Sequence, residues 1–342
     1  MDIQSALSHI SEGNNLSHDQ CKDIFALIMT GETTDAQIGA FLASMRVKGE
    51  TADELAGAAQ TMRNLSTKVD LPPTEYLVDT CGTGGSGAKL FNISTAAAFV
   101  AAAAGANVAK HGNRKATSFC GSADLLEVAG VNLNLRPEQI AQCIKEIGVG
   151  FMFAPSHHNA MRHAAHVRQE LGIRTMMNIL GPMTNPAGAQ KQVIGVFSPE
   201  WQRKIAEVLL RLGSERALVV HSAGLDEIRL DQPTNIVELR DKKIEEYSIN
   251  PEDFGIKSAN ADSLARLVAH SAEQSLELVY QSLTDLDSPA AEIVSLNAGA
   301  AIYTSGITAD LSKGVAMAQD AIASGQAREK LAELTRITKL MS

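Results

Sequence analysis

A glycine-rich stretch, DTCGTGGSGAKLFNIST at residues 79–95, has the composition of an anion-binding loop. Four of its glycines fall within residues 82–87, between the apolar segment EYLVDT and the alanine-rich segment AAAFVAAAAG. Glycine lets a backbone turn sharply and approach a ligand, and a helix N-terminus offers free N–H groups and a positive dipole end. Asn92, Ser94 and Thr95 would add side-chain hydrogen bonds at the helix start. The stretch matches neither a Walker motif nor a complete G-x-G-x-x-G, so a phosphate site and a tight turn before an N-capped helix both remain open.

A second polar stretch, AKHGNRKATSFCGSADLLE at residues 109–127, gathers positive charge in an otherwise acidic chain. The loops at the ends of neighbouring strands converge in an open α/β sheet, so this stretch and the glycine loop would face one crevice. The alternative is a solvated basic loop. The cationic side chains are Lys110, His111, Arg114 and Lys115, the neutral donors are Asn113, Thr117, Ser118 and Ser122, and the glycines are Gly112 and Gly121.

A third stretch, HSAGLDEIRL at residues 221–230, carries the adjacent carboxylates Asp226 and Glu227. Adjacent acidic residues are usually surface charge. Beside a phosphate site they become candidate Mg²⁺ ligands, because Mg²⁺ typically takes one or two carboxylates together with waters and substrate phosphates.

The elements that would position these residues fall into two parts. Residues 1 to about 70 are expected to be helical, with segments that begin at Ser17, Thr34 and Thr51; Thr51 and Glu54 form a capping box. The segment DLPP at 70–73 is expected to be a linker. From there, strands alternate with helices of about a dozen residues, which predicts an α/β fold with a parallel or mixed sheet. The expected strands are EYLVDT, NVAKHG, VGFMFAP, KQVIGVFS and RALVVHS, and HHNAMRHAAHVRQELG is expected to be an amphipathic helix.

Composition narrows the class of protein. The chain has 342 residues, 45% of them hydrophobic, and a net charge of −9 without a long basic run, which argues against general nucleic-acid binding. The four cysteines show no C-x-x-C spacing and are expected to be reduced thiols. No segment resembles a signal peptide or approaches the roughly 18 apolar residues of a membrane span. A soluble, cytoplasmic protein is therefore expected.

Taken together, the three stretches resemble the anthranilate phosphoribosyltransferase family over nearly the whole chain. The resemblance rests on GTGGSG, FNIST, KHGNR, CGSADLLE, VRQELGIRTMMNILGPMTNPAG and GLDEI, in this order and at the family's spacing. It implies transfer of the phosphoribosyl group from 5-phosphoribosyl-1-pyrophosphate to the amine of anthranilate, in tryptophan biosynthesis, giving N-(5-phosphoribosyl)anthranilate and pyrophosphate. It also implies a small N-terminal α-helical domain, residues 1–70 joined by helices from about 157–190. A larger α/β domain with a mostly parallel sheet, of the nucleoside phosphorylase/phosphoribosyltransferase type, would cover residues 74–342.

The resemblance also implies roles for individual residues. Anthranilate would contact Gly82, Asn113 and Arg168, and Ser94, Asp226 and Glu227 would bind two Mg²⁺ ions per subunit. Many members carry Asp where this chain has Ser86, Thr where it has Leu90 and Pro where it has Asn159, so contacts there are expected to differ. Phosphoribosyl pyrophosphate would be held by Gly82, Gly85, Ser86, Asn92, Ile93, Ser94, Thr95, Lys110, His111, Gly112, Asn113, Arg114, Lys115, Ala116, Thr117, Ser118 and Ser122.

The expected chemistry needs no strong general base, because an aromatic amine is already nucleophilic and uncharged. None is assigned; His111 and His158 could line the site or simply pack. The resemblance further implies a homodimer, and the apolar faces of the N-terminal helices, including Ile24, Leu27, Ile28 and Phe41, are expected to form its interface. Two alternatives remain: a pyrimidine nucleoside phosphorylase of the same fold, and a non-catalytic nucleic-acid-binding relative, which would need a basic face.

Overall fold

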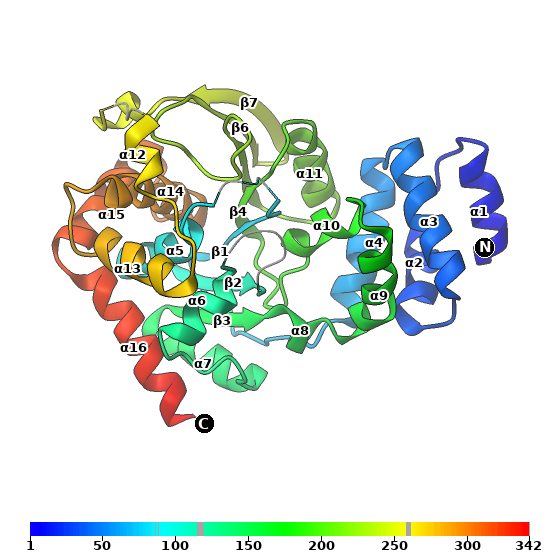
Figure 1. Ribbon diagram of the computed structural model, residues 1–342, viewed down its shortest axis with the longest axis horizontal. Coiled ribbons are helices and arrows are strands. Elements are labelled where there is room, and N and C mark those ends of the chain that lie inside the picture. Colours follow the sequence, from blue (N-terminus) through cyan, green and yellow to red (C-terminus); the bar gives the residue numbers. More distant parts are fainter. Residues whose placement is uncertain (86, 88, 115–119, 258–260, 342) are drawn as a thin grey trace.

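The computed structural model describes residues 1–341 except 86, 88, 115–119 and 258–260. A bundle of helices forms one end of an elongated molecule, and a sheet flanked by helices forms the other (Figure 1). The N-terminus lies in the bundle and the C-terminus at the opposite end. The expected architecture, a small helical part followed by a larger α/β part with a mostly parallel sheet, is confirmed. No helix in the described ranges is long and apolar enough to cross a membrane.

Four helices build the N-terminal end, and their starts follow the predicted caps. The side chains of Ser17, Thr34 and Thr51 each accept a hydrogen bond from a backbone N–H three residues on, in reciprocal capping boxes. The first helix was not singled out from the sequence; it is capped by the Asp2 carboxylate. The helices are α1 (Ile3–Ser11), α2 (His18–Thr30), α3 (Asp35–Lys48) and α4 (Ala52–Leu65).

The described residues form a seven-stranded sheet in the order β3-β2-β1-β4-β5-β6-β7. The five strands predicted from the sequence are parallel to one another, and the last two are antiparallel. The strands are β1 (Leu77–Gly82), β2 (Asn107–Gly112), β3 (Val149–Phe153), β4 (Lys191–Gly195), β5 (Arg216–His221), β6 (Thr234–Arg240) and β7 (Lys243–Ile249).

The hairpin of β6 and β7 was not predicted. Strand β7, KIEEYSI, carries charged residues at three of its seven positions and is largely exposed, so it lacks the apolar run expected of a strand in this class of sheet. Its turn consists of Asp241 and Lys242, both with positive φ (51° and 61°), as a two-residue hairpin turn requires.

Small residues let the helices of the α/β part pack closely on one another. The alanine-rich helix α5 (Ile93–Ala103) is almost entirely buried and contacts α14 (Pro289–Ser305) and α16 (Gln326–Leu340). Helix α14 crosses α15 (Leu311–Ala323) at Gly299, where a Cβ would lie 2.7 Å from the backbone of Val315. The other α/β helices are α6 (Ser122–Val128), α7 (Pro137–Ile147), α11 (Glu200–Arg211), η3 (Pro251–Phe254), α12 (Ala261–Ala265) and α13 (Ala272–Ser282).

The segment between β3 and β4 consists of several short helices, and the amphipathic helix expected over HHNAMRHAAHVRQELG is interrupted near its start. It forms short pieces with a break at His158, whose φ of −116° and ψ of 54° are not helical. Helix α9 packs against α2 and α3, and α10 packs against α4. The segment therefore joins the bundle to the carboxyl ends of the strands. Its elements are α8 (Ala154–His157), η1 (Asn159–Met161), α9 (Arg162–Leu171), α10 (Met177–Leu180) and η2 (Gly181–Met183).

Candidate active site

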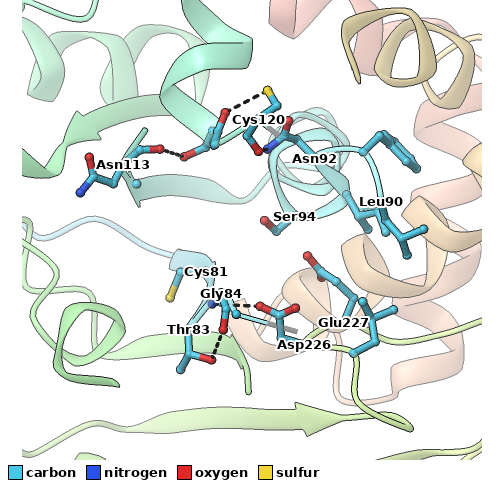
Figure 2. Close-up of a pocket in the computed structure, with 18 of the residues that line it drawn as sticks. Cys81, Thr83, Gly84, Leu90, Asn92, Ser94, Asn113, Cys120, Asp226 and Glu227 are labelled. Carbon is cyan, nitrogen blue, oxygen red and sulfur yellow. Dashed lines mark hydrogen bonds between the residues drawn. The ribbon is translucent and has the colours of Figure 1, made fainter. Parts of the chain in front are cut away.

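The three polar stretches meet at the carboxyl ends of the parallel strands. The glycine loop follows β1, the basic stretch follows β2, and the acidic pair follows β5 (Figure 2). Together they line a cavity of about 300 Å³, which also receives the N-terminus of α5. This is the strand-end crevice in which open α/β sheets bind ligands.

The start of α5 contributes less side-chain polarity to this cavity than expected. Asn92 lines it, but its side chain accepts a hydrogen bond from Ser275 Oγ (2.8 Å) and donates one to the Cys120 carbonyl (3.4 Å). Thr95 is buried at 1% exposure and is not among the lining residues. Ile93 and Ser94 do line the cavity. At this helix start, Ser94 is therefore the residue that offers a side-chain oxygen to the cavity.

The acidic pair lies opposite Ser94. Figure 2 shows Ser94, Asp226 and Glu227 directing side-chain oxygens toward the same space. Asp226 Oδ2 accepts a hydrogen bond from the Gly84 N–H (3.0 Å), which joins the acidic loop to the glycine loop. Burial, followed by the neighbouring Asp226 carboxylate, raises the pKa of Glu227 to about 8. A cation between the two carboxylates would relieve this repulsion.

The donor set fits a hard divalent cation. Carboxylate and hydroxyl oxygens are ligands that Mg²⁺ prefers, and it commonly keeps positions for water and substrate phosphates. Within the described residues no group of three or more His, Cys, Asp or Glu side chains could form a closed metal cage. Asp226, Glu227 and Ser94 therefore suit an open Mg²⁺ site that substrate oxygens complete.

Lys110 is buried beneath the cavity. It is 3% exposed, and its Nζ donates hydrogen bonds to the Thr80 carbonyl (2.6 Å) and to Ser94 Oγ (3.4 Å). Burial lowers the pKa of Lys110, and the Asp79 carboxylate opposes that shift. Asp79, fully buried in β1, accepts a hydrogen bond from the His111 N–H (3.2 Å). Asp79 was not assigned a role from the sequence, although a carboxylate within an otherwise apolar strand could have indicated one.

The Arg114 side chain in the basic stretch is paired with acidic residues. Its guanidinium donates hydrogen bonds to both carboxylate oxygens of Glu127 (2.6 and 2.9 Å) and to Asp124 (3.3 Å), and it lies over the Phe153 ring. These partners raise the pKa of Arg114 above its ordinary value. Part of the expected positive charge is thus neutralised by α6.

A second cavity of about 520 Å³ adjoins the first. The two share Gly82, Thr83 and the end of β2 from His111 to Arg114. On the far side it is lined by residues of α4, α8, α9 and α10, several of them apolar. All three residues implied for anthranilate, Gly82, Asn113 and Arg168, line this cavity. Gly82 and Asn113 also line the first cavity.

Arg168 suits a carboxylate ligand. It lies on α9 facing the second cavity, and its side chain is half-buried. Burial lowers the pKa of Arg168, and its guanidinium has no hydrogen bond or ion pair with any described residue. An unpaired, partly desolvated guanidinium is a planar fork ready for a planar carboxylate.

His111 and His158 lie together on the wall of the second cavity, with ring centroids 5.1 Å apart. Burial lowers the pKa of both, that of His158 to about 4. Both rings are therefore neutral at physiological pH and are weak bases. This fits the expectation that the chemistry needs no strong general base.

The remaining implied residues divide into two groups. Gly85, Gly112 and Ser122 line the first cavity. Ser86, Lys115, Ala116, Thr117 and Ser118 lie outside the described residues, so their implied contacts with phosphoribosyl pyrophosphate stay predictions.

Comparison with known proteins assigns the chain to a family. Two family models match: "Glycosyl transferase family, a/b domain" over residues 74–328, and "Glycosyl transferase family, helical bundle domain" over residues 4–66. Among curated relatives, the anthranilate phosphoribosyltransferase of Ectopseudomonas mendocina is 56% identical over 99% of this chain and 97% of its own. That of Cellvibrio japonicus is 54% identical over the full length of both.

Solved structures agree with these sequence relatives. The anthranilate phosphoribosyltransferase of Thermus thermophilus is 41% identical and superimposes with a TM-score of 0.92, covering 98% of this chain and 99% of that one. The Saccharomyces cerevisiae enzyme in complex with PRPP and Mg, at 24% identity and a TM-score of 0.88 over 99% and 98% of the two chains, shares the fold. The helical bundle, the α/β part and the strand-end site thus define a glycosyl transferase. Within that class, the chain belongs to the anthranilate phosphoribosyltransferase family.

Proposed function

We propose that this protein transfers the phosphoribosyl group of 5-phosphoribosyl-1-pyrophosphate to the amine of anthranilate, forming N-(5-phosphoribosyl)anthranilate and pyrophosphate in tryptophan biosynthesis. The observation that carries the proposal is the pair of adjoining cavities. One has the glycine loop, a helix N-terminus and the acidic pair; the other has the unpaired Arg168. Gly82 and Asn113 line both, so the two substrates would meet there.

The residues account for the reaction as follows. The first cavity binds the phosphates of the donor through loop N–H groups and the helix N-terminus. Asp226, Glu227 and Ser94 would hold Mg²⁺, which would supply positive charge to offset the negative charge of the pyrophosphate leaving group. Arg168 orients anthranilate by its carboxylate. The amine of anthranilate, which is uncharged at neutral pH, then bonds to the ribose carbon as the bond to pyrophosphate breaks. Its surplus proton leaves the nitrogen for the released pyrophosphate or for water.

Several finer features belong to the same proposal. Two Mg²⁺ ions per subunit, a homodimeric assembly and a cytoplasmic location follow from the family resemblance. The helical domain is residues 1–70 joined by helices from about 157–190, a division that the packing of α9 on α2 and α3 supports. The α/β domain is then residues 74–342.

The test is a direct assay. The purified protein is mixed with anthranilate, phosphoribosyl pyrophosphate and Mg²⁺, and anthranilate fluorescence is followed. We expect fluorescence to fall only when both the donor and Mg²⁺ are present. No loss at any Mg²⁺ concentration would contradict the proposal. If the protein instead cleaved a pyrimidine nucleoside with inorganic phosphate, it would be identified as a nucleoside phosphorylase.

A charge-matched pair of variants tests the metal assignment. The double variant Asp226→Asn with Glu227→Gln should lose turnover and be rescued poorly by excess Mg²⁺, with its far-UV circular dichroism unchanged. The control, Asp285→Asn with Asp287→Asn, removes the same charge from an exposed loop and should keep turnover. Near-wild-type turnover of the first double variant at ordinary Mg²⁺ would show that these carboxylates are not the ligands.

A further inference from the structure

Arg174 connects the two halves of the site without lining either cavity. It lies between α9 and α10, the helices that carry Arg168 and Asn178 on the wall of the second cavity. Its Nη2 donates a hydrogen bond to the carbonyl oxygen of Gly85, 2.5 Å away, in the glycine loop of the first cavity. Arg174 is absent from the lining of both cavities.

The guanidinium is held in place by an aromatic ring. The Cζ atom of Arg174 lies 4.2 Å from the centroid of the Phe197 ring, within the range of a cation–π contact. Phe197 follows β4, and its N–H donates a hydrogen bond to Thr83 Oγ1 (3.3 Å) at the start of the glycine loop. Arginine suits this position better than lysine, because a planar guanidinium can stack on the ring and still donate in its own plane.

The contact with Gly85 is close. A Cβ on Gly85 would lie 3.0 Å from Arg174 Nη2 and 3.3 Å from Cζ, and the φ of Gly85 is +82°. Only glycine adopts this backbone conformation readily and leaves room for the guanidinium. The N–H of the preceding residue, Gly84, donates a hydrogen bond to Asp226 Oδ2. Two consecutive residues of the loop are thus held by charged side chains from different parts of the chain.

We infer that Arg174 is a positioning residue for the transfer reaction: from the segment that carries the anthranilate-side helices, it holds the glycine loop in the shape that binds the phosphoribosyl donor. The inference rests on the proposed function. It predicts that loss of Arg174 weakens donor binding, although Arg174 lies on the connection between helices that line the anthranilate-side cavity. A role confined to stabilising the α9–α10 connection would instead lower the melting temperature and leave the donor KM unchanged.

The experiment compares Arg174→Met with Arg174→Lys and with Arg328→Met, which removes an exposed arginine of α16. Steady-state kinetics are measured with each substrate varied in turn, and folding is followed by thermal unfolding. We expect Arg174→Met to raise the KM for the phosphoribosyl donor about tenfold, the order associated with one hydrogen bond from a charged group. On the same scale of free energy to affinity, the KM for anthranilate should change by less than about threefold. Arg174→Lys should lie between Arg174→Met and wild type, and Arg328→Met should match wild type.

The Phe197 ring provides a second, independent arm. Phe197→Leu should raise the donor KM in the same direction by a smaller factor, and the double variant with Arg174→Met should be no worse than Arg174→Met alone, because the ring acts through the guanidinium. An unchanged donor KM in Arg174→Met, or equal increases in both KM values with a lowered melting temperature, would overturn the inference. Wild-type turnover in the same assay tests the proposed function separately, so the two failures are distinguishable.

Discussion

Arg168 lines the second cavity and not the first, so it distinguishes the two cavities most clearly. Its guanidinium faces the second cavity without a described protein partner, so a ligand carboxylate would supply the missing hydrogen bonds. Arg168→Ala should therefore raise the KM for anthranilate about ten- to a hundredfold, which corresponds to about 1.5–3 kcal/mol for a charge-assisted hydrogen bond. The donor KM should change much less. Steady-state kinetics with each substrate varied in turn measure this contrast.

The converse variant is Lys110→Met, which keeps the length of a buried side chain but removes the ammonium beside Ser94. It should weaken the donor more than anthranilate. If Arg168→Ala weakened both substrates equally, the assignment of one substrate to each cavity would be wrong, even with the reaction correctly identified.

Gly195 shapes the proposed metal site from the end of β4. A Cβ at this position would overlap the backbone carbonyl of Asp226, and the Gly195 carbonyl accepts a hydrogen bond from the Thr83 N–H (2.9 Å). Gly195→Ala should displace the acidic pair at a cost of about 1–3 kcal/mol. This corresponds to an increase of about five- to a hundredfold in the Mg²⁺ concentration for half-maximal turnover. Mg²⁺ titration of turnover is the measurement.

The matched control is Gly39→Ala, in helix α3, where a Cβ would make only an ordinary contact with Val167 (3.6 Å). It should leave the Mg²⁺ requirement unchanged. A Gly195→Ala protein that is folded and has the wild-type Mg²⁺ requirement would show that the acidic loop tolerates displacement.

At the scale of elements, the end of β2 and helix α8 bring three buried histidines together. Burial lowers the pKa of His111, His157 and His158. Such a group stays neutral in the folded protein while the unfolded chain takes up a proton near pH 6.5. The unfolded state then binds more protons, so stability falls as pH drops below about 6.5.

For His158 alone, with a folded pKa of about 4, the expected loss of unfolding free energy between pH 7.5 and pH 5 is about 2 kcal/mol. Urea unfolding at the two pH values should show a loss of at least this size in the wild type, because His111 and His157 add to it. The loss of unfolding free energy should be smaller by about 2 kcal/mol in His158→Gln. His166→Gln, an exposed position on α9, should retain the wild-type pH dependence. Equal pH dependence in His158→Gln and wild type would show that His158 is not buried neutral.

The assembly is a property of the whole molecule, and one part of its sequence-based prediction was wrong. Ile24, Leu27, Ile28 and Phe41 were expected at a twofold interface, but Ile24, Ile28 and Phe41 are 0% exposed in the chain's own core. Leu27 is partly exposed, so its place at an interface stays a prediction. Helical periodicity marks an apolar face without stating what covers it. Here α1 packs on α3 and α2 packs on α4, and the bundle core continues onto α11 and one face of the sheet.

A homodimer nevertheless remains our prediction. Light scattering should give about twice the chain mass of 36.3 kDa. Val47, at the end of α3, is 89% exposed and is an apolar candidate for the interface. Val47→Asp should shift the protein toward monomer, whereas Leu340→Asp, 75% exposed at the other end of the molecule, should not. A monomeric wild type at micromolar concentration would contradict the prediction.

The sequence by itself determined those features that depend only on residues close together along the chain. The caps at Ser17, Thr34 and Thr51 fixed where helices begin, apolar runs identified the five parallel strands, and the glycines at 82–87 marked the loop at a helix start. The family's motifs then supplied the reaction. Each of these signals lies within about a dozen consecutive residues, and local backbone preferences and side-chain-to-backbone hydrogen bonds are enough to produce it.

Only the tertiary structure decided which distant groups meet. The Arg114 side chain pairs with Glu127, and Thr95 is buried. Asp226 packs against Gly195, a residue that no sequence motif identified. Arg174 reached Gly85 across 89 positions of sequence. Such contacts follow from the order of the strands and the packing of helices on them, because side-chain position is set by the elements that surround it. The sequence therefore identified the chemistry of the site, and the tertiary packing determined which residues position the site.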